Sequence, residues 1–288
     1  MIAFDNVYKR YKKDTEVFAD LSMSILPGEF VVITGAPGSG KTTFLKMILN
    51  EEKPSEGAVL FEGDDLSRLS SSKIKNYRRS LGTIFQDFKL LPHKTVYENV
   101  AFALEVLGFD DEEIARDAQE VLDIVGMSHR KQHFPKELSG GEKQKVSIAR
   151  ALISRPKVIL ADEPTGSLDE NGAKEIAQVL KAIHEKQKVS IARALISRPK
   201  VILADEPTGS LDENGAKEIA QALKAIHALG TTIIIATHND KIFAGVKNIR
   251  KISIKDGGVV AEVLKNIVYS NFIETDMPEK KEYNTEEN

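Results

Sequence analysis

The stretch that decides the fold is Phe30–Thr43, FVVITGAPGSGKTT. It begins with a continuous run of apolar, mostly β-branched residues, which predicts a buried parallel strand. It ends in a motif of the form G-x-x-x-x-G-K-[ST], which predicts a turn into a helix over residues 41–50. In such a turn successive backbone N–H groups point inward, and the helix N-terminus adds a partial positive charge. The stretch therefore predicts a cradle for nucleotide phosphates.

Two side chains of this cradle have specific chemical tasks. Lys41 would reach the β- and γ-phosphates of ATP, and the Thr42 hydroxyl would bind Mg²⁺. The alternative is a glycine-rich turn that binds nothing. It is disfavoured because the motif lies between an apolar strand and a helix, the context that the mechanism requires. The loop residues expected to contact the nucleotide are Gly35, Gly38, Ser39, Gly40, Lys41, Thr42 and Thr43.

Outward from the cradle, apolar strands alternate with helical patterns, which predicts an α/β fold around a parallel sheet. Residues 2–8 and 16–26 alternate in polarity and predict an antiparallel edge sheet, so the sheets together are of mixed type. Further strands are expected at 58–61, 81–85, 157–162 and 231–237. We expect an ATP-binding core formed by 1–87 and 138–265, a helical subdomain over 88–137, and a polar, disordered tail over 266–288.

Composition excludes several classes of function. The 288 residues include 40 Lys and Arg against 43 Asp and Glu, a formal charge of −3, whereas a general nucleic-acid binder would be strongly basic. The absence of cysteine excludes disulfides, zinc-thiolate sites and thiol catalysis. No apolar run approaches the ~20 residues that a membrane helix needs, and no signal peptide is visible. We therefore expect a soluble, intracellular chain.

Two further motifs narrow the chemistry. An apolar strand ends in Asp162 and Glu163, and buried strands rarely end in two carboxylates unless a cation or a proton transfer uses them. Asp162 would hold Mg²⁺, and Glu163 would accept a proton from the attacking water. Residues Ser139, Gly140 and Gly141 begin a helix over 142–154 and predict a second anion site. Because the chain has only one ATP cradle, the second site is expected to act on the ATP of another molecule.

These motifs, in this order and together with four further positions, resemble the ABC ATPase family over residues 11–258. The resemblance implies a P-loop fold with a helical subdomain. It also implies a homodimer in which each ATP lies between the cradle of one subunit and the Ser139–Gly141 turn of the other. It further implies roles for the four positions: Tyr11 stacks on adenine, Gln86 links Mg²⁺ and the attacking water to a membrane partner, Asp169 belongs to the catalytic set, and His238 contacts the γ-phosphate.

Within this family, residues 51–57, 86–92 and 95–103 resemble the ATPases of bacterial cell division. That resemblance implies an integral membrane partner and a place on the inner face of the bacterial plasma membrane. Two alternatives stay open: the ATPase of a lipoprotein-release or macrolide-type exporter, and an inactive variant that acts only as a binding scaffold. A soluble family member of translation or DNA repair is disfavoured, because such chains usually carry two ATPase units or a long coiled coil.

A tandem repeat departs from the family pattern. Residues 142–184 are repeated as 185–227, and the two copies differ only at Val179 and Ala222. Two near-identical copies indicate a recent tandem duplication rather than a solenoid. The chain therefore carries a second carboxylate pair, Asp205 and Glu206, and a second candidate for Asp169, namely Asp212.

The repeat leads to two expectations. The Ser139–Gly141 turn runs directly into copy one, so we expect Asp162 and Glu163 to serve the active site, although the strand before His238 is joined to copy two. Residues 172–197 lack proline and an interior glycine, so we expect one fused helix that carries strand 201–204 away from its core. A second chain would then cover this strand by domain swapping. The alternative is a bulge on a working monomer.

Overall fold

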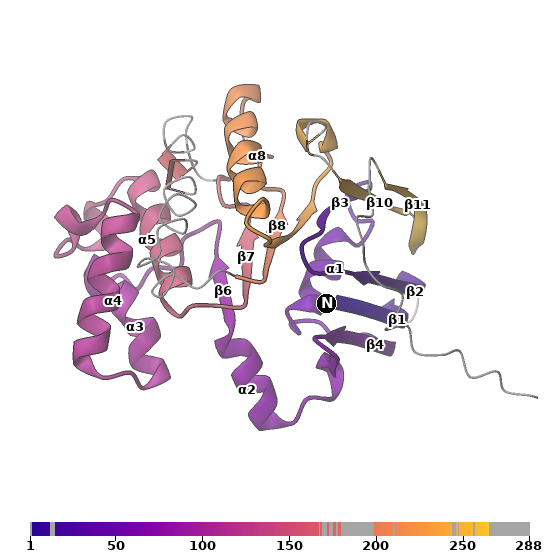
Figure 1. Ribbon diagram of the computed structural model, residues 1–288, viewed down its shortest axis with the longest axis horizontal. Coiled ribbons are helices and arrows are strands. Elements are labelled where there is room, and N and C mark those ends of the chain that lie inside the picture. Colours follow the sequence, from indigo (N-terminus) through magenta and orange to yellow (C-terminus); the bar gives the residue numbers. More distant parts are fainter. Residues whose placement is uncertain are drawn as a thin grey trace, which may run out of the picture.

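The computed structural model describes residues 2–11, 15–166, 168, 172, 175–176, 178–179, 199–209, 211–243, 246, 248–255 and 257–264. These residues form two sheets with helices around the larger one (Figure 1). The chain is of the α/β class, as the alternating pattern predicts, with a mainly parallel sheet beside an antiparallel one.

The smaller sheet is antiparallel and has the strand order β2-β1-β4-β5. Its strands are β1 (Ile2–Arg10), β2 (Glu16–Ile25), β4 (Glu56–Phe61) and β5 (Asp64–Asp65). One face of this sheet packs on helix α1 (Lys41–Ile48), where Phe4 stacks on Phe44 with ring centroids 4.3 Å apart. The edge sheet expected near the N-terminus is therefore present, and it covers the helix that follows the cradle.

The larger sheet has seven strands in the order β11-β10-β3-β9-β8-β7-β6. All neighbours are parallel except β10 and β11. Its strands are β3 (Phe30–Thr34), β6 (Leu81–Ile84), β7 (Val158–Asp162), β8 (Val201–Asp205), β9 (Thr232–Ala236), β10 (Ile249–Lys255) and β11 (Gly258–Leu264).

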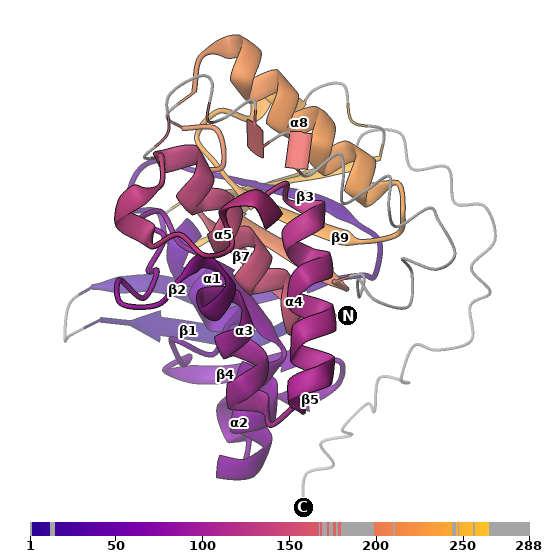
Figure 2. The same cartoon turned by 90° about the vertical axis from the view of Figure 1, so that its left-hand side faces the viewer.

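Besides α1, three of the described helices form one group, and two others lie apart from it and from each other (Figure 1). Helices α3 (Val96–Leu107), α4 (Asp111–Ile124) and α5 (Gly140–Ile153) lie together at the β6 end of the large sheet (Figures 1 and 2). Helix α2 (Ser71–Arg79) precedes β6, and α8 (Glu213–His227) packs near β9. Single 3₁₀ turns occur at Leu66–Arg68, Ser128–Arg130, Pro135–Glu137 and Asp240–Phe243.

Local signals explain where these helices begin. Thr95 and Glu98 form a capping box at the start of α3, and Ser139 and Glu142 form another at the start of α5. Asp212 caps α8 by accepting a hydrogen bond from the N–H of Gly215. Within 88–137, where a helical subdomain is expected, the structure has the helices α3 and α4, and α5 packs against both.

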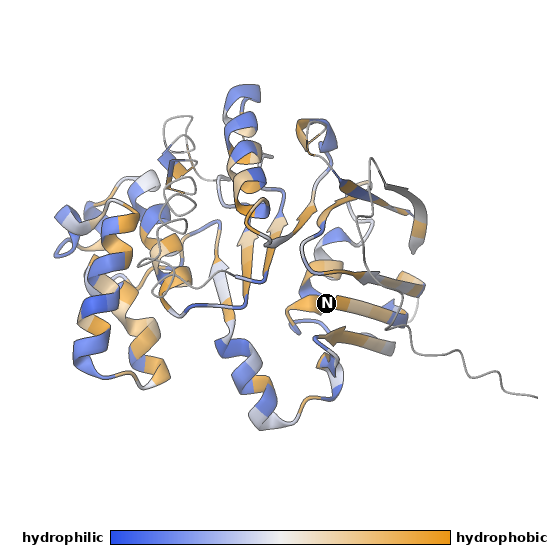
Figure 3. Cartoon of the chain, viewed as in Figure 1, coloured by the Kyte–Doolittle hydropathy of each residue, from blue (hydrophilic) through white to orange (hydrophobic). Residues whose placement is uncertain are grey.

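The core lies on both faces of the large sheet. Figure 3 shows apolar strands at the centre of the sheet and a mostly polar α2. Strand β3 is buried along Phe30–Ile33: Val31 and Ile33 face α1 and the small sheet, whereas Phe30 and Val32 face the helices. The continuous apolar run in the sequence reflects this burial on two faces.

The expected displacement of copy two from the core is wrong. Strand β8 lies between β7 and β9, and its Val201–Ala204 stretch is buried. It pairs with β7 in equal register, so Val158 faces Val201 and Asp162 faces Asp205. A strand can be inserted into a parallel sheet when its side chains are apolar on both faces, and the strand of copy two has the same apolar residues as the strand of copy one. Because β8 is already buried in the sheet of its own chain, it does not need a second chain to cover it, and the reason to expect strand exchange is removed.

The two copies also share a partner at the opposite end of their strands. Glu62 forms ion pairs with Lys157, at 3.3 Å, and with Lys200, the equivalent lysine of copy two. The hydrogen bond from Lys200 is the main reason why the pKa of Glu62 lies below its usual value. The fused helix expected over 172–197 and the disordered tail expected over 266–288 fall largely or wholly outside the described residues. Among the described residues, no helix is long and apolar enough to cross a membrane.

Candidate nucleotide-binding site

The cradle has the backbone that the motif predicts. Gly40 has φ 105° and forms the N-cap of α1, and Gly38 has φ 80°. A Cβ at Gly40 would lie 2.7 Å from Val17 Cγ1 and 2.9 Å from Phe18 Cζ, so only glycine fits there. Val17 and Phe18 of the antiparallel sheet thus pack directly against the loop at Gly40 and restrict its conformation.

Lys41 and Ser39 hold their polar groups inside this loop. The Lys41 ammonium group is buried and donates to the carbonyl oxygens of Gly35, at 3.0 Å, and Ala36, at 3.3 Å. The Ser39 hydroxyl is buried and has no hydrogen-bond partner among the described residues. A buried ammonium group bonded to carbonyl oxygens and a buried hydroxyl without a partner are both stabilised when an anion binds beside them. The loop therefore fits a bound phosphate.

Copy two supplies the carboxylates next to the cradle. Asp205 is only 8 % exposed and accepts a hydrogen bond from the Thr42 side chain. Burial raises the pKa of Asp205, and the charges of Asp162 and Glu206 act in the same direction. A buried carboxylate beside a threonine hydroxyl is a donor set that fits Mg²⁺, which binds oxygen ligands.

Glu206 faces the strand that ends in His238. Its carboxylate accepts hydrogen bonds from the Thr237 hydroxyl, at 3.0 Å, and from the backbone N–H of His238, at 3.0 Å. The Nδ1 atom of His238 lies 2.9 Å from Glu206 Oε2. Glu206 has φ 43° and bonds through its N–H to the carbonyl oxygen of Ala236, so a left-handed turn aims the side chain at β9.

Copy one places its carboxylates elsewhere, contrary to the expectation that Asp162 and Glu163 serve the cradle. Asp162 is exposed at the end of β7, one strand further from β9. A Cβ at Gly166 would lie 2.8 Å from Gln86 Nε2 and 2.9 Å from Glu163 Oε2, so Glu163 and Gln86 converge on the same turn. The reason is sheet order: β8 pairs with β9, and β7 pairs with β6.

The remaining expected residues are Tyr11, Asp212 and Asp169. The Tyr11 hydroxyl is 3.4 Å from Thr43 Oγ1, and the Lys9 ammonium group lies 4.6 Å from the centroid of the Tyr11 ring. Asp212 is exposed and caps α8. Asp169 lies outside the described residues.

The Ser139–Gly141 turn begins α5, at the β6 end of the molecule. The Ser139 hydroxyl accepts a hydrogen bond from the N–H of Glu142, at 3.2 Å, and the side chain of Glu142 accepts one from the N–H of Ser139, at 2.8 Å. A Cβ at Gly141 would lie 3.2 Å from Glu175 Oε2 and 3.3 Å from Gly172 Cα, so glycine allows copy one to approach this turn closely. This turn thus lies at the β6 end of the large sheet, whereas the cradle follows β3 in the same chain.

Sequence comparison identifies relatives of the whole chain. The ABC transporter family profile matches residues 18–166. The cell division ATP-binding protein FtsE of Bacillus subtilis (strain 168) is 39 % identical over 262 residues, which cover 91 % of this chain and 96 % of the relative. FtsE of Escherichia coli (strain K12) is 44 % identical over 170 residues, which cover 59 % of this chain and 77 % of the relative.

Solved structures agree with the fold. A dimeric, post-hydrolysis state of an ATP-binding cassette bound to ADP and Pi has a TM-score of 0.64 and 29 % identity, covering 92 % of this chain and 99 % of that one. Another dimeric structure of a bacterial ABC transporter cassette gives a TM-score of 0.64, at 30 % identity and with the same coverage.

Proposed function

Because the chain belongs to the ABC transporter family of ATPases, we propose that it binds and hydrolyses ATP as the nucleotide-binding subunit of a bacterial cell-division complex. The identity with FtsE over almost the whole length supports this function. We also propose an integral membrane partner resembling FtsX, and a place on the cytoplasmic face of the plasma membrane. The observation that carries the proposal is the convergence of Lys41, Thr42, Asp205, Glu206 and His238.

In this proposal the cradle binds the phosphates and copy two supplies the carboxylates. Lys41 and the loop N–H groups hold the β- and γ-phosphates. Thr42 and Asp205 would hold Mg²⁺, which neutralises charge on the phosphate oxygens. Tyr11 lies close enough to Thr43 to contact the adenine side of the same nucleotide.

Glu206 is the proposed general base. Its Oε1 accepts from the backbone N–H of His238, and its Oε2 faces the Thr237 hydroxyl and His238 Nδ1. Because a carboxylate has about four acceptor positions, acceptor capacity remains to take a proton from an attacking water. His238 stays partly exposed beside it and can donate to a phosphate oxygen. We further propose that a second copy of the chain completes the site with its Ser139–Gly141 turn, in the head-to-tail dimer that the family resemblance implies.

The test compares the two equivalent glutamates. Glu206→Gln should lower the rate of ATP hydrolysis by about 100-fold or more, because loss of a general base costs about that much. ATP binding should persist, because the cradle is untouched. Glu163→Gln is the matched control, since it makes the same chemical change at the same place in the other copy.

Each other result has a defined meaning. If Glu163→Gln abolishes hydrolysis and Glu206→Gln does not, copy one is the catalytic copy and the assignment fails. If the unsubstituted chain binds ATP but shows no turnover, the chain is a nucleotide-binding scaffold rather than an enzyme.

A further inference from the structure

The extra strand lies between the ATP cradle and Gln86. Strand β3 carries the cradle, strand β6 is followed by Gln86, and the three strands β9, β8 and β7 separate them. One of the last two strands exists only because of the repeat. Neighbouring strands are about 4.8 Å apart, so β3 and β6 lie about 19 Å apart rather than about 14 Å.

The spacing is fixed by hydrogen bonds between the two copies. The N–H of Glu163 donates to the carbonyl oxygen of Asp205, at 2.9 Å. In the turns that follow, the Thr165 hydroxyl donates to the carbonyl oxygen of Pro207, at 3.1 Å. The two turns therefore stack in register, and the wider sheet is held at the edge where the site lies.

The loop that carries Gln86 is also attached to the far half of the molecule. Arg150 of α5 donates to the carbonyl oxygens of Phe88, at 2.8 Å, and Lys89, at 2.6 Å. Both of these residues have positive φ, so the arginine bonds to a sharply folded backbone. Gln144 of the same helix donates to the carbonyl oxygen of Pro164, at 2.7 Å. The loop that follows Gln86 and the turn after β7 are thus both bonded to α5.

We propose that the duplication has divided the ATP site: copy two completes the cradle, whereas Gln86 is positioned by Glu163 of copy one, one strand away from the bound nucleotide. This inference rests on the proposed function. In the wider sheet Gln86 no longer positions Mg²⁺ or the attacking water. The distance between the helical subdomain and the γ-phosphate then also increases by about 5 Å.

The matched control is a chain without residues 142–184, here called the one-copy chain. It retains Asp205 and Glu206, and it joins Gly141 to Glu185 as the full chain joins Gly141 to Glu142. Since β7 and β8 have the same sequence and register, β8 can pair directly with β6. The two chains therefore differ in one strand of spacing and in little else at the site.

The experiment measures the distance from bound Mn²⁺, with a non-hydrolysable ATP analogue, to a nitroxide label on a single cysteine. The chain has no native cysteine. A label at the exposed Asp87, next to Gln86, should lie about 5 Å further from Mn²⁺ in the full chain than in the one-copy chain. A label at Lys46 on α1 is the control, because its distance to Mn²⁺ should be equal in both chains.

Equal Mn²⁺–Asp87 distances in the two chains, with the Lys46 signal present, would overturn the inference and leave the proposed function standing. Absence of the Lys46 signal would mean that no metal-nucleotide binds, which contradicts the proposed function. The spacing is still tested in that case by two nitroxides at Lys46 and Asp87, whose separation should be greater in the full chain.

A second experiment compares how much activity the same substitution removes from the full chain and from the one-copy chain. Gln86→Ala should lower the rate of hydrolysis by a factor about ten times larger in the one-copy chain than in the full chain. An equal loss in both chains would show that Gln86 still reaches the nucleotide, and would contradict the proposal.

Discussion

Gly40 shows at the scale of one residue how strictly the cradle depends on its sequence. Its φ of 105° and the closeness of Val17 and Phe18 exclude a side chain on two independent grounds. Gly40→Ala should therefore destabilise the fold by about 2 kcal/mol, from left-handed strain and steric overlap together. ATP binding should be lost with it. Chemical unfolding and calorimetric titration with Mg-ATP measure the two effects.

The matched control for Gly40 is Gly108, which also has positive φ, at 82°, but where an added Cβ would meet no atom within 4 Å. Gly108→Ala should cost about 1 kcal/mol from strain alone, because the residue ends α3 and nothing crowds it. ATP affinity should stay as in the parent chain. If both substitutions weakened ATP binding equally, steric fit at Gly40 would not be the cause.

Asp205 illustrates how the proposed metal-binding role of a residue can oppose the stability of the fold. Burial raises its pKa in the folded protein above the value of 3.8 for a free side chain. The folded state therefore binds the proton more tightly than the unfolded state, and the free energy of unfolding falls as the pH rises above 3.8. Asp205→Asn should stabilise the nucleotide-free protein at pH 7.5 and have little effect near pH 4.

Denaturant titrations at the two pH values test this effect of Asp205. Asp162→Asn is the control, because the equivalent carboxylate in copy one is exposed. Binding of Mg-ATP should weaken in Asp205→Asn and not in Asp162→Asn. Destabilisation by Asp205→Asn at pH 7.5 would indicate that the hydrogen bond with Thr42 outweighs desolvation.

At the scale of elements, the pattern of apolar residues predicts most of the fold. The strands near 30–34, 157–162 and 231–237 form because each contains a continuous apolar run buried on two faces. The strand near 81–85 also forms, but as the edge strand β6, in which burial alternates along the chain. Strand β10 has no such run, because Arg250, Lys251 and Lys255 lie between and after its apolar residues, and its pattern does not stand out in the sequence. Helix α2 has no fully buried residue, and its apolar face consists only of Ile74 and Tyr77, which is too short to stand out in the sequence.

The choice between the two copies could not be made from the sequence. Continuity with the Ser139–Gly141 turn correctly assigns α5 to copy one, but it does not determine which strand pairs with β9. That pairing depends on sheet order, and both strands have the same side chains to offer. The phosphate loop, by contrast, is predictable residue by residue, because its glycines and Lys41 act within one local turn.

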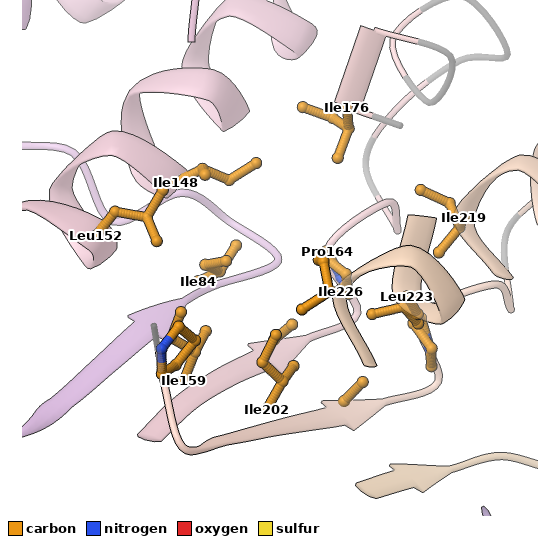
Figure 4. Close-up of a pocket in the computed structure, with 14 residues that line it drawn as sticks. Ile84, Ile148, Leu152, Ile159, Pro164, Ile176, Ile202, Ile219, Leu223 and Ile226 are labelled. Atoms are coloured by element: carbon orange, nitrogen blue, oxygen red, sulfur yellow. The ribbon is translucent and has the colours of Figure 1, made fainter. Parts of the chain in front are cut away.

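A cavity lies on the helical face of the core, next to the strands of both copies. Apolar side chains from β6, β7, β8, α5 and α8 surround a cavity of about 60 Å³ (Figure 4). A cavity of this size forfeits dispersion contacts of its lining and costs about 1 kcal/mol. The labelled side chains around it are Ile84, Ile148, Leu152, Ile159, Pro164, Ile176, Ile202, Ile219, Leu223 and Ile226.

The cavity predicts opposite effects of one substitution in the two chains. Ala204 lines the cavity, and Ala204→Val adds two methyl groups to it. In the full chain this should raise the free energy of unfolding by about 1 kcal/mol. In the one-copy chain, where the sheet and its helices close up, the same change should overpack the core and destabilise it by about 1–3 kcal/mol. Equal signs in denaturant titrations of the two chains would argue against a void created by the repeat.

At the scale of the whole molecule, a wider sheet need not prevent dimerisation. In a symmetric head-to-tail pair, the cradle of each subunit faces the Ser139–Gly141 turn of the other. The separation of cradle and turn within one chain then equals the separation of the two ATP sites. If both chains lengthen this separation by the same amount, both sites can still close.

This symmetry gives a prediction that depends on the dimer alone. Glu206→Gln should retain ATP and form a dimer in both the full chain and the one-copy chain, as light scattering would show. With a single nitroxide at Lys46, the distance between the labels of the two subunits should be about 5 Å longer in the full-chain dimer, because each cradle moves away from the Ser139–Gly141 turn of its own chain. A full chain that stays monomeric with ATP, while the one-copy chain dimerises, would mean that the added strand distorts the face on which the subunits meet. Equal label distances in two stable dimers would mean that the sheet bends to bring each cradle back to its original spacing.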